Sequence, residues 1–136
     1  MFAKTLSLHA QESLALLGKD HLPMLFSTHT FLAVKIADHR DIGAMKIAAV
    51  MDRGSKKDFV DLYFLSQQNL IIDDCLKYYD QKYGVLASNL YSIIVSLNYF
   101  AEAEKSDMPV MLRKVSWNDV KKFFAKEAVR LAKKFL

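Results

Sequence analysis

Cysteine is almost absent from this chain, which holds a single one, Cys75, in 136 residues. One thiol cannot form an intramolecular disulfide, and it excludes a metal site built from several cysteines. A cytoplasmic location is the simplest expectation for a chain without disulfides. Because Cys75 lies among Ile71, Ile72 and Leu76 with no base beside it in sequence, we expect a small core residue rather than a nucleophile.

Glycine and proline are also scarce, with 4 and 2 residues, and no Ser/Gly-rich or repetitive stretch is present. Long disordered linkers are therefore not expected. No run approaches the roughly 18 apolar residues that a membrane-spanning helix needs. Because Lys4 and His9 interrupt any signal-peptide core, we expect a soluble chain that is not exported and does not contact a membrane.

Apolar residues, in contrast, make up 52% of the chain, which is enough for one hydrophobic core at this length. We expect residues 1–136 to form a single, mainly α domain. Its predicted architecture is a bundle of five or six helices with at most a short strand near residues 31–36. No spacing typical of a helical metal site occurs among the histidines, which are His9, His21, His29 and His39.

Helix boundaries are indicated by glycines and by capping residues. Gly54 and Gly84 each follow a helical pattern that they can end in the left-handed conformation. Ser55-Lys-Lys-Asp58 and Ser116-Trp-Asn-Asp119 have the form of capping boxes with Asp in the last position, and Ser88 is a candidate N-cap. The predicted helices therefore cover residues 7–17, 39–54, 55–65, 71–83, 88–100 and 116–135.

Residues 41–65 are dense in ionisable side chains. Lys46 and Arg53 are seven residues apart, so they lie on one face of a helix. Asp58 and Asp61, three residues apart, share a face of the next helix. Two carboxylates on one face can hold a divalent metal or orient a base. Alternatively, Asp58 caps its helix while Asp61 pairs with Lys57 or with Arg53.

The same residues suggest a phosphate site. A phosphate needs several cations converging on one small volume, and two helices that meet at Gly54 can supply Lys46 and Arg53 from adjoining ends. The helix that begins after Ser55 would add free N–H groups and the positive end of its dipole. Spacing alone leaves both the phosphate site and simple ion pairing open.

The segment DIGAMKIAAVMDRGSKKDFVDLYFL, residues 41–65, resembles the AbiEii/AbiGii-type nucleotidyltransferase toxin family. The likeness continues through residues 96–104, Met108-Pro109 and residues 115–124. These segments resemble the C-terminal helical part of one branch of that family, over about residues 36–125.

The resemblance implies an enzyme class that transfers a nucleotidyl group from a nucleoside triphosphate with Mg²⁺, in some members to an RNA end. It implies catalytic roles for Lys46, which would contact the triphosphate, and for Asp58, the later acidic position. Arg53 and Lys57 would lie beside the phosphates, and Asp61 would support them.

One part of the family pattern is missing. Members carry an earlier Gly-Ser and Asp-x-Asp, and the Asp-x-Asp pair binds the metal ions. This chain has no Asp-x-Asp, and its only Gly-Ser is Gly54-Ser55, inside the later block. Since residues 6–26 resemble the family's opening helix, an internally shortened gene is one hypothesis. We expect a chain that keeps the phosphate-contacting helices but is inactive alone, with Mg²⁺ and nucleotide implied by the resemblance only.

The charge balance allows a different function. With 19 Lys and Arg against 15 Asp and Glu, the net charge is +4, which modestly favours anionic partners. Cations gather in residues 121–136, as in a solvated helix face or an RNA-binding surface. The alternative function is therefore a non-catalytic helical interaction module that binds a partner protein or RNA. The expected partners are a second copy of the chain and, from the resemblance, an antitoxin protein or tRNA.

Overall fold

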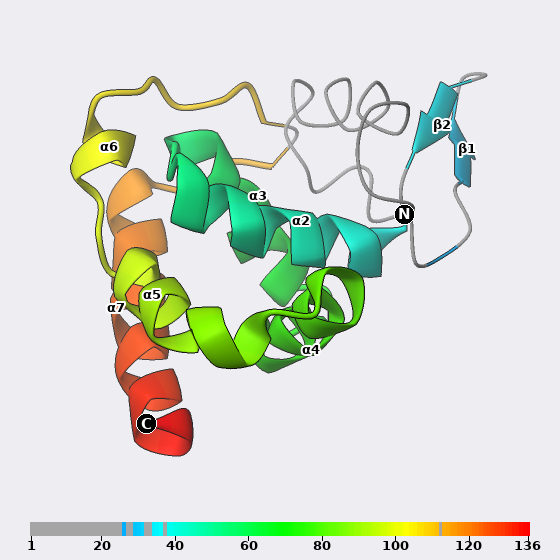
Figure 1. The fold of residues 1–136 in the computed structure, drawn as a ribbon. Coiled ribbons are helices and arrows are strands. Elements are labelled where there is room, and N and C mark those ends of the chain that lie inside the picture. The colour runs from blue at the N-terminus through cyan, green and yellow to red at the C-terminus, as the bar shows by residue number, and fades with distance from the viewer. Residues whose placement is uncertain (1–25, 27–28, 32–33, 37, 112) are drawn as a thin grey trace.

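The computed structural model describes residue 26 and residues 29–31, 34–36, 38–111 and 113–136. Within these residues a two-stranded hairpin precedes six helices (Figure 1), which confirms the mainly α prediction. The elements are β1 (His29–Phe31), β2 (Val34–Ile36), α2 (His39–Asp52), α3 (Lys56–Ser66), α4 (Ile72–Tyr83), α5 (Leu86–Leu97), α6 (Ala101–Glu104) and α7 (Trp117–Phe135). None of the described helices combines the length and apolarity that a membrane crossing requires.

The sequence predicts one short strand near residues 31–36, whereas the structure has two short strands, β1 and β2, in this region. β1 and β2 pair antiparallel, with Phe31 opposite Val34 and His29 opposite Ile36. The chain therefore reverses within the segment that the sequence pattern presents as one extended run. The helix predicted over residues 7–17 lies outside the described residues.

Two glycines end helices as predicted. Gly54 follows α2 with φ of +58°, and Gly84 follows α4 with φ of +69°. Both values lie in the left-handed region, which glycine adopts without the steric cost of a Cβ. The turn at Gly54 brings α3 back against α2, and this is the turn that positions the charged residues.

The capping residues of α3 and α7 are also confirmed. The Ser55 hydroxyl accepts the N–H of Asp58, and the Asp58 carboxylate returns a bond to the backbone of Ser55, so the capping box is complete. At α7 the Ser116 hydroxyl accepts the N–H of Asp119 at 3.1 Å. Short side-chain acceptors at these positions satisfy amides that have no partner inside the helix.

The predicted start of α5 at Ser88 is wrong. The helix begins at Leu86, and the Leu86 N–H donates to the Asp80 carboxylate at 3.2 Å. Because a side chain of α4 supplies this first acceptor, the helix needs no capping serine of its own. The helix also ends at Leu97, so Phe100 lies outside it and precedes α6.

The core forms where α2 packs against α3, α4 and α5, and where α7 packs against α3 and α5 (Figure 1). Since α2 and α3 contact each other inside this arrangement, polar side chains on their facing surfaces are shielded from water. Fully buried apolar side chains come from every long helix, among them Ile42, Ile47, Phe59, Leu62, Ile72, Ile93, Leu97, Phe124 and Leu131.

The predicted core role of Cys75 is confirmed. Its side chain is fully buried, and burial raises the pKa of the thiol to about 12. The thiolate, which is the nucleophilic form, is therefore scarce at neutral pH. Cys75 instead fills the space against Gly43 of α2.

Helices α2 and α4 approach closely at this contact. A Cβ added at Gly43 would lie 2.9 Å from Sγ of Cys75 and 3.1 Å from a side-chain carbon of Leu70. We expect Gly43→Ala to lower the free energy of unfolding by about 1 kcal/mol, because the overpacking exceeds alanine's advantage in helix propensity. The Cys75→Ala background removes the sulfur and should recover most of that loss. Urea unfolding of the four variants measures the coupling, and an equal cost of Gly43→Ala in both backgrounds would contradict it.

Candidate functional site

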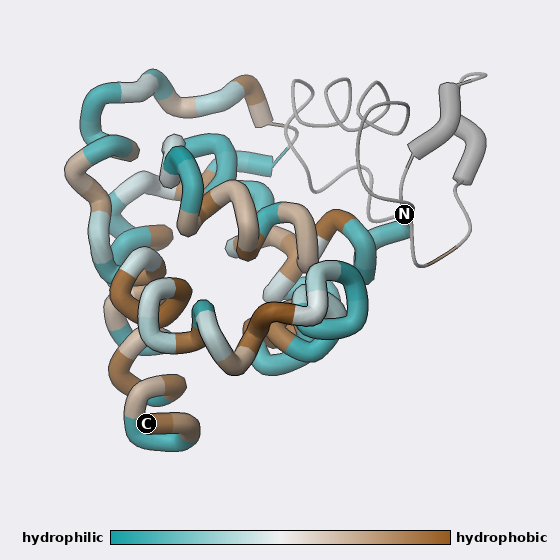
Figure 2. The backbone as a smooth tube through the Cα atoms, in the orientation of Figure 1, coloured by the Kyte–Doolittle hydropathy of each residue, from teal (hydrophilic) through white to brown (hydrophobic). Residues whose placement is uncertain are grey.

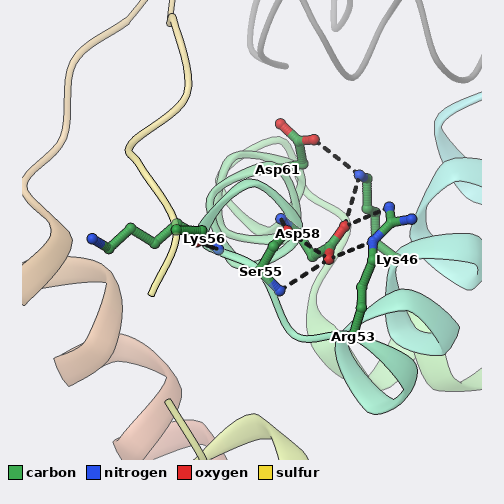
Figure 3. A network of polar contacts seen from close by, with 7 residues as sticks. Lys46, Arg53, Ser55, Lys56, Asp58 and Asp61 are labelled. Atoms are coloured by element: carbon green, nitrogen blue, oxygen red, sulfur yellow. Dashed lines mark hydrogen bonds and ion pairs between the residues drawn. The ribbon is translucent and has the colours of Figure 1, made fainter. Parts of the chain in front are cut away.

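Four charged side chains converge where α2 and α3 meet (Figure 3). The Lys46 ammonium lies 3.3 Å from Oδ1 of Asp58 and 3.1 Å from Oδ2 of Asp61. Arg53 donates from Nε and Nη2 to the two carboxylate oxygens of Asp58, at 2.9 and 3.0 Å. We call Lys46, Arg53, Asp58 and Asp61 the charge cluster.

Local structure accounts for this convergence. Lys46 lies on α2, and Arg53 is the residue that follows the helix. The left-handed turn at Gly54 then reverses the chain, so that α3 presents Asp58 and Asp61, one turn apart, to α2. The cluster therefore depends on a short-range turn together with the spacing within two helices.

The charge cluster is buried at its centre and open at one edge. The side chains of Asp58 and Asp61 are 0% exposed and that of Lys46 is 6% exposed, whereas Arg53 is 62% exposed. Two cations face two anions, which offsets the cost of removing each charge from water. Arg53 is consequently the member of the cluster that meets solvent.

The electrostatics of Asp58 reflect its partners. Burial alone would raise its pKa, but hydrogen bonds from Arg53 and Ser55 and the charge of Lys46 outweigh burial and lower the pKa of Asp58 to about 2. In turn, the hydrogen bond to Asp58 raises the pKa of Arg53. A proton-transfer group works best with a pKa near the working pH. This arrangement therefore suits Asp58 to a fixed negative charge rather than to a general base.

The N-terminus of α3 differs from the prediction that it offers free amides to an anion. The Lys56 N–H donates to the Ser106 hydroxyl at 3.0 Å, across fifty residues of sequence. The Asp58 N–H donates to the Ser55 hydroxyl at 3.4 Å. That prediction is wrong for these two donors, because the capping box and a distant serine already satisfy them.

Lys57 is not drawn into the charge cluster. It is partly buried on α3, and its side chain forms no ion pair or hydrogen bond with any residue that the structure describes. The predicted pairing of Asp61 with Lys57 is therefore wrong, and the ion pair that the structure shows joins Asp61 to Lys46. The neighbouring Lys56 side chain points away from the cluster (Figure 3). Spacing along one helix cannot show a partner on another helix.

The two aspartates do not fit a magnesium ion in this arrangement. Each carboxylate has an oxygen within 3.3 Å of the Lys46 ammonium, which a divalent cation would meet as a like charge. Over the described ranges, no group of three His, Cys, Asp or Glu side chains gathers as a metal site requires. The described residues thus do not supply the ligand set that the family resemblance implies for Mg²⁺.

The structure contains a second buried ion pair that the sequence does not predict. Asp41, at the start of α2, lies 3.4 Å from the ammonium of Lys82, near the end of α4, and the two side chains are 0% and 2% exposed. Asp41 also accepts the N–H of Phe26 at 2.8 Å. The partners are 41 residues apart in sequence, so no periodicity within either helix indicates the pair.

Comparison with known proteins confirms the predicted resemblance. A family model described as nucleotidyl transferase AbiEii toxin, type IV TA system, matches residues 16–133, which extends beyond residues 36–125 at both ends. An uncharacterized protein of Aquifex aeolicus (strain VF5) is 36% identical over 98 residues, which cover 71% of this chain and 45% of that relative. The chain thus spans less than half the length of that relative. No solved structure matches the chain significantly.

Proposed function

Because the chain belongs to the AbiEii nucleotidyl transferase toxin family of type IV toxin–antitoxin systems, we propose that its charge cluster is the phosphate-binding part of a nucleotidyl-transfer site. One observation carries the proposal. Of the residues to which the family resemblance gives roles, both acids and two of the three cations form a single network, in which each ion pair spans 3.3 Å or less, and only Lys57 lies outside it. Membership of such a family also implies an antitoxin partner.

Arg53 is the group of the charge cluster that binds phosphate oxygens. Asp58 takes two of the N–H donors of the guanidinium and fixes its orientation. A guanidinium has about five such donors in a rigid plane, so an edge remains for a ligand. Its side chain is 62% exposed, so a nucleotide in solution can reach it. Planar, paired donors match the geometry of phosphate oxygens.

Lys46 acts from inside the site. Its ammonium lies between two buried carboxylates and is nearly out of contact with water. Direct contact with a triphosphate requires that it leave these partners. In the arrangement of the described residues, Lys46 is a positioning residue that holds Asp58, and through Asp58 it holds Arg53.

We expect this chain alone to bind nucleotide without transferring it. Nucleotidyl transfer needs metal ions that bridge and neutralise the phosphates. The sequence has no Asp-x-Asp, and the carboxylates of Asp58 and Asp61 are already neutralised by cations. Incubation of purified chain with Mg²⁺, labelled nucleoside triphosphates and total tRNA tests this expectation. Robust label transfer that survives repurification would overturn it.

Phosphate binding by Arg53 is tested by calorimetric titration with each of the four nucleoside triphosphates. A charge-assisted hydrogen bond contributes about 1.5–3 kcal/mol, so Arg53→Ala should weaken nucleotide binding by about tenfold or more. Lys126→Ala is the matched control, because it removes an exposed cation of α7 instead. Equal affinities of the Arg53→Ala variant and the parent chain would contradict the assignment.

A second candidate function, RNA binding, is favoured by one face of α7. Lys122, Lys126 and Lys133 are exposed on the same side of the helix and have no ion pair among the described residues, whereas Arg130 is held by Asp73 at the same helix surface. Three lysines that neutralise phosphates of single-stranded RNA predict a slope of about −2 for log K against log salt. Here Lys126→Ala should weaken tRNA binding and Arg53→Ala should not, the reverse of the nucleotide experiment.

A further inference from the structure

An acid of α4 holds two cations of α7. Asp73, in the first turn of α4, accepts hydrogen bonds from Nη2 and Nη1 of Arg130, the latter at 3.3 Å, and from Nζ of Lys134 at 2.6 Å. The same guanidinium also donates to both carboxylate oxygens of Glu127, at 2.8 and 2.9 Å. We call Asp73, Glu127, Arg130 and Lys134 the α4–α7 network.

Helix α7 is seated on the core by its apolar side, not by this network. Brown and teal segments alternate along the helix in Figure 2, as in a helix with one buried side. Its buried residues are Val120, Phe124, Ala128 and Leu131. Arg130 and Lys134 lie on the solvent side, where they are 42% and 54% exposed. Because exposed ion pairs contribute little to stability, the main effect of the network is on the charge that α7 presents to solvent.

The two held cations border free lysines of α7. Arg130 is four residues after Lys126 and three before Lys133, so the three lie on adjoining positions of one helix surface, and Lys134 continues it. The side chains of Lys126 and Lys133 are exposed and form no ion pair with the residues that the structure describes. Asp73 is only 14% exposed, and the hydrogen bonds from Arg130 and Lys134 lower its pKa to about 2. Its carboxylate is therefore charged at neutral pH and neutralises part of this basic surface.

We propose that Asp73 is an autoinhibitory residue that withholds Arg130 and Lys134 from RNA. The inference rests on the proposed binding of RNA by α7 and names the group that limits it. Carboxylate and phosphate oxygens accept the same charge-assisted hydrogen bonds from a guanidinium or an ammonium. An RNA phosphate must therefore displace the Asp73 carboxylate to reach either cation. A ligand whose negative charges repeat along a chain gains most from two further cations on adjoining turns.

Replacing Asp73 with asparagine should strengthen RNA binding. The amide has the size of the carboxylate but no charge, so Arg130 and Lys134 become available as two further phosphate contacts. For labelled oligouridylate, the slope of log K against log salt should steepen from about −2 to about −3.5, with about tenfold tighter binding at low salt. Asp74→Asn is the matched control, because it removes the same charge from the same turn of α4. The side chain of Asp74 forms no ion pair with the described residues, so this variant should keep the slope of the parent chain.

Removing the two cations identifies them as the released donors. The double substitution Arg130→Gln with Lys134→Gln should leave the slope of the parent chain at about −2, because Asp73 already holds both cations. In the Asp73→Asn background, the same double substitution should return the slope from about −3.5 to about −2. A network that only supports the fold predicts the reverse for Asp73→Asn, namely binding that is no tighter than that of the parent. Far-UV circular dichroism verifies that each variant is folded.

The same titrations distinguish a failure of this inference from a failure of RNA binding by α7. If the parent binds oligouridylate but Asp73→Asn leaves the slope unchanged, or Asp74→Asn steepens it equally, the role of Asp73 is overturned while binding by the free lysines stands. If Lys126→Ala does not weaken binding by the parent, the RNA surface itself is wrong. Absence of binding by both the parent and Asp73→Asn would overturn both.

Discussion

Replacing Lys46 with methionine is expected to lower the free energy of unfolding by about 3–5 kcal/mol. Methionine fills much of the same volume but takes away the ammonium that lies within 3.3 Å of two fully buried carboxylates. Asp58 keeps its bonds to Arg53, yet both acids lose a charge that compensates for burial. Guanidinium unfolding at pH 7, followed by circular dichroism, gives the loss. Lys105→Met, on a 73% exposed side chain, should change stability by less than about 0.5 kcal/mol.

The deficit of the Lys46→Met variant should shrink as the pH falls from 7 to about 4. Protonation of one buried carboxylate relieves the uncompensated charge, so acid favours the folded variant relative to its unfolded chain. In the parent chain, acid has the opposite effect and lowers the stability of the folded state. The pKa of Asp58 is about 2 when folded, below its ordinary value. The stability that Asp58 contributes is therefore complete above the unfolded pKa and is lost as the pH falls towards 2. Stability curves of the two proteins that stay parallel on acidification would contradict this account.

Part of the geometry of the charge cluster could be predicted from the sequence. Lys46 with Arg53, and Asp58 with Asp61, could be predicted to share faces because each pair lies on one helix or at its end, where the α-helical period fixes direction. That the two pairs meet follows from the turn at Gly54, which the sequence also indicates. Which acid binds which cation depends on the packing of α2 against α3. Residue spacing does not encode that packing.

The sequence-based predictions miss a hydrogen-bond or ion-pair partner where that partner comes from another helix or loop. Ser88 is a good capping residue by type, but Asp80 from the preceding helix caps the turn two residues earlier. The free amides expected after Ser55 are partly consumed by Ser106, fifty residues further on. The buried pair of Asp41 with Lys82 likewise joins two helices. In each case a side chain from another element satisfies a polar group, and the spacing within one helix does not indicate that partner.

The second large effect is expected at Phe59, whose ring packs on the side of α3 that faces away from the charge cluster. Phe59, next to Asp58 in sequence, is 0% exposed and its ring lies 5.2 Å from that of Phe100, 5.9 Å from Trp117 and 5.2 Å from Phe124. These rings meet at the tilted and edge-on angles that aromatic pairs prefer. Phe59→Ala would leave a cavity among three rings, and we expect it to lower the free energy of unfolding by about 3–5 kcal/mol.

Comparing Phe59→Ala with two other variants distinguishes the role of Phe59 in the core from the role of the charge cluster. Phe135→Ala, on a ring that is 43% exposed near the end of α7, should cost less than about 1 kcal/mol. The Phe59→Ala deficit should also be nearly independent of pH between 4 and 7, because the substitution removes no charge, whereas the Lys46→Met deficit shrinks over the same range. Urea unfolding at several pH values measures both. A Phe59→Ala loss no larger than that of Phe135→Ala would show that α7 and the segment around Phe100 are not anchored on α3 by this ring.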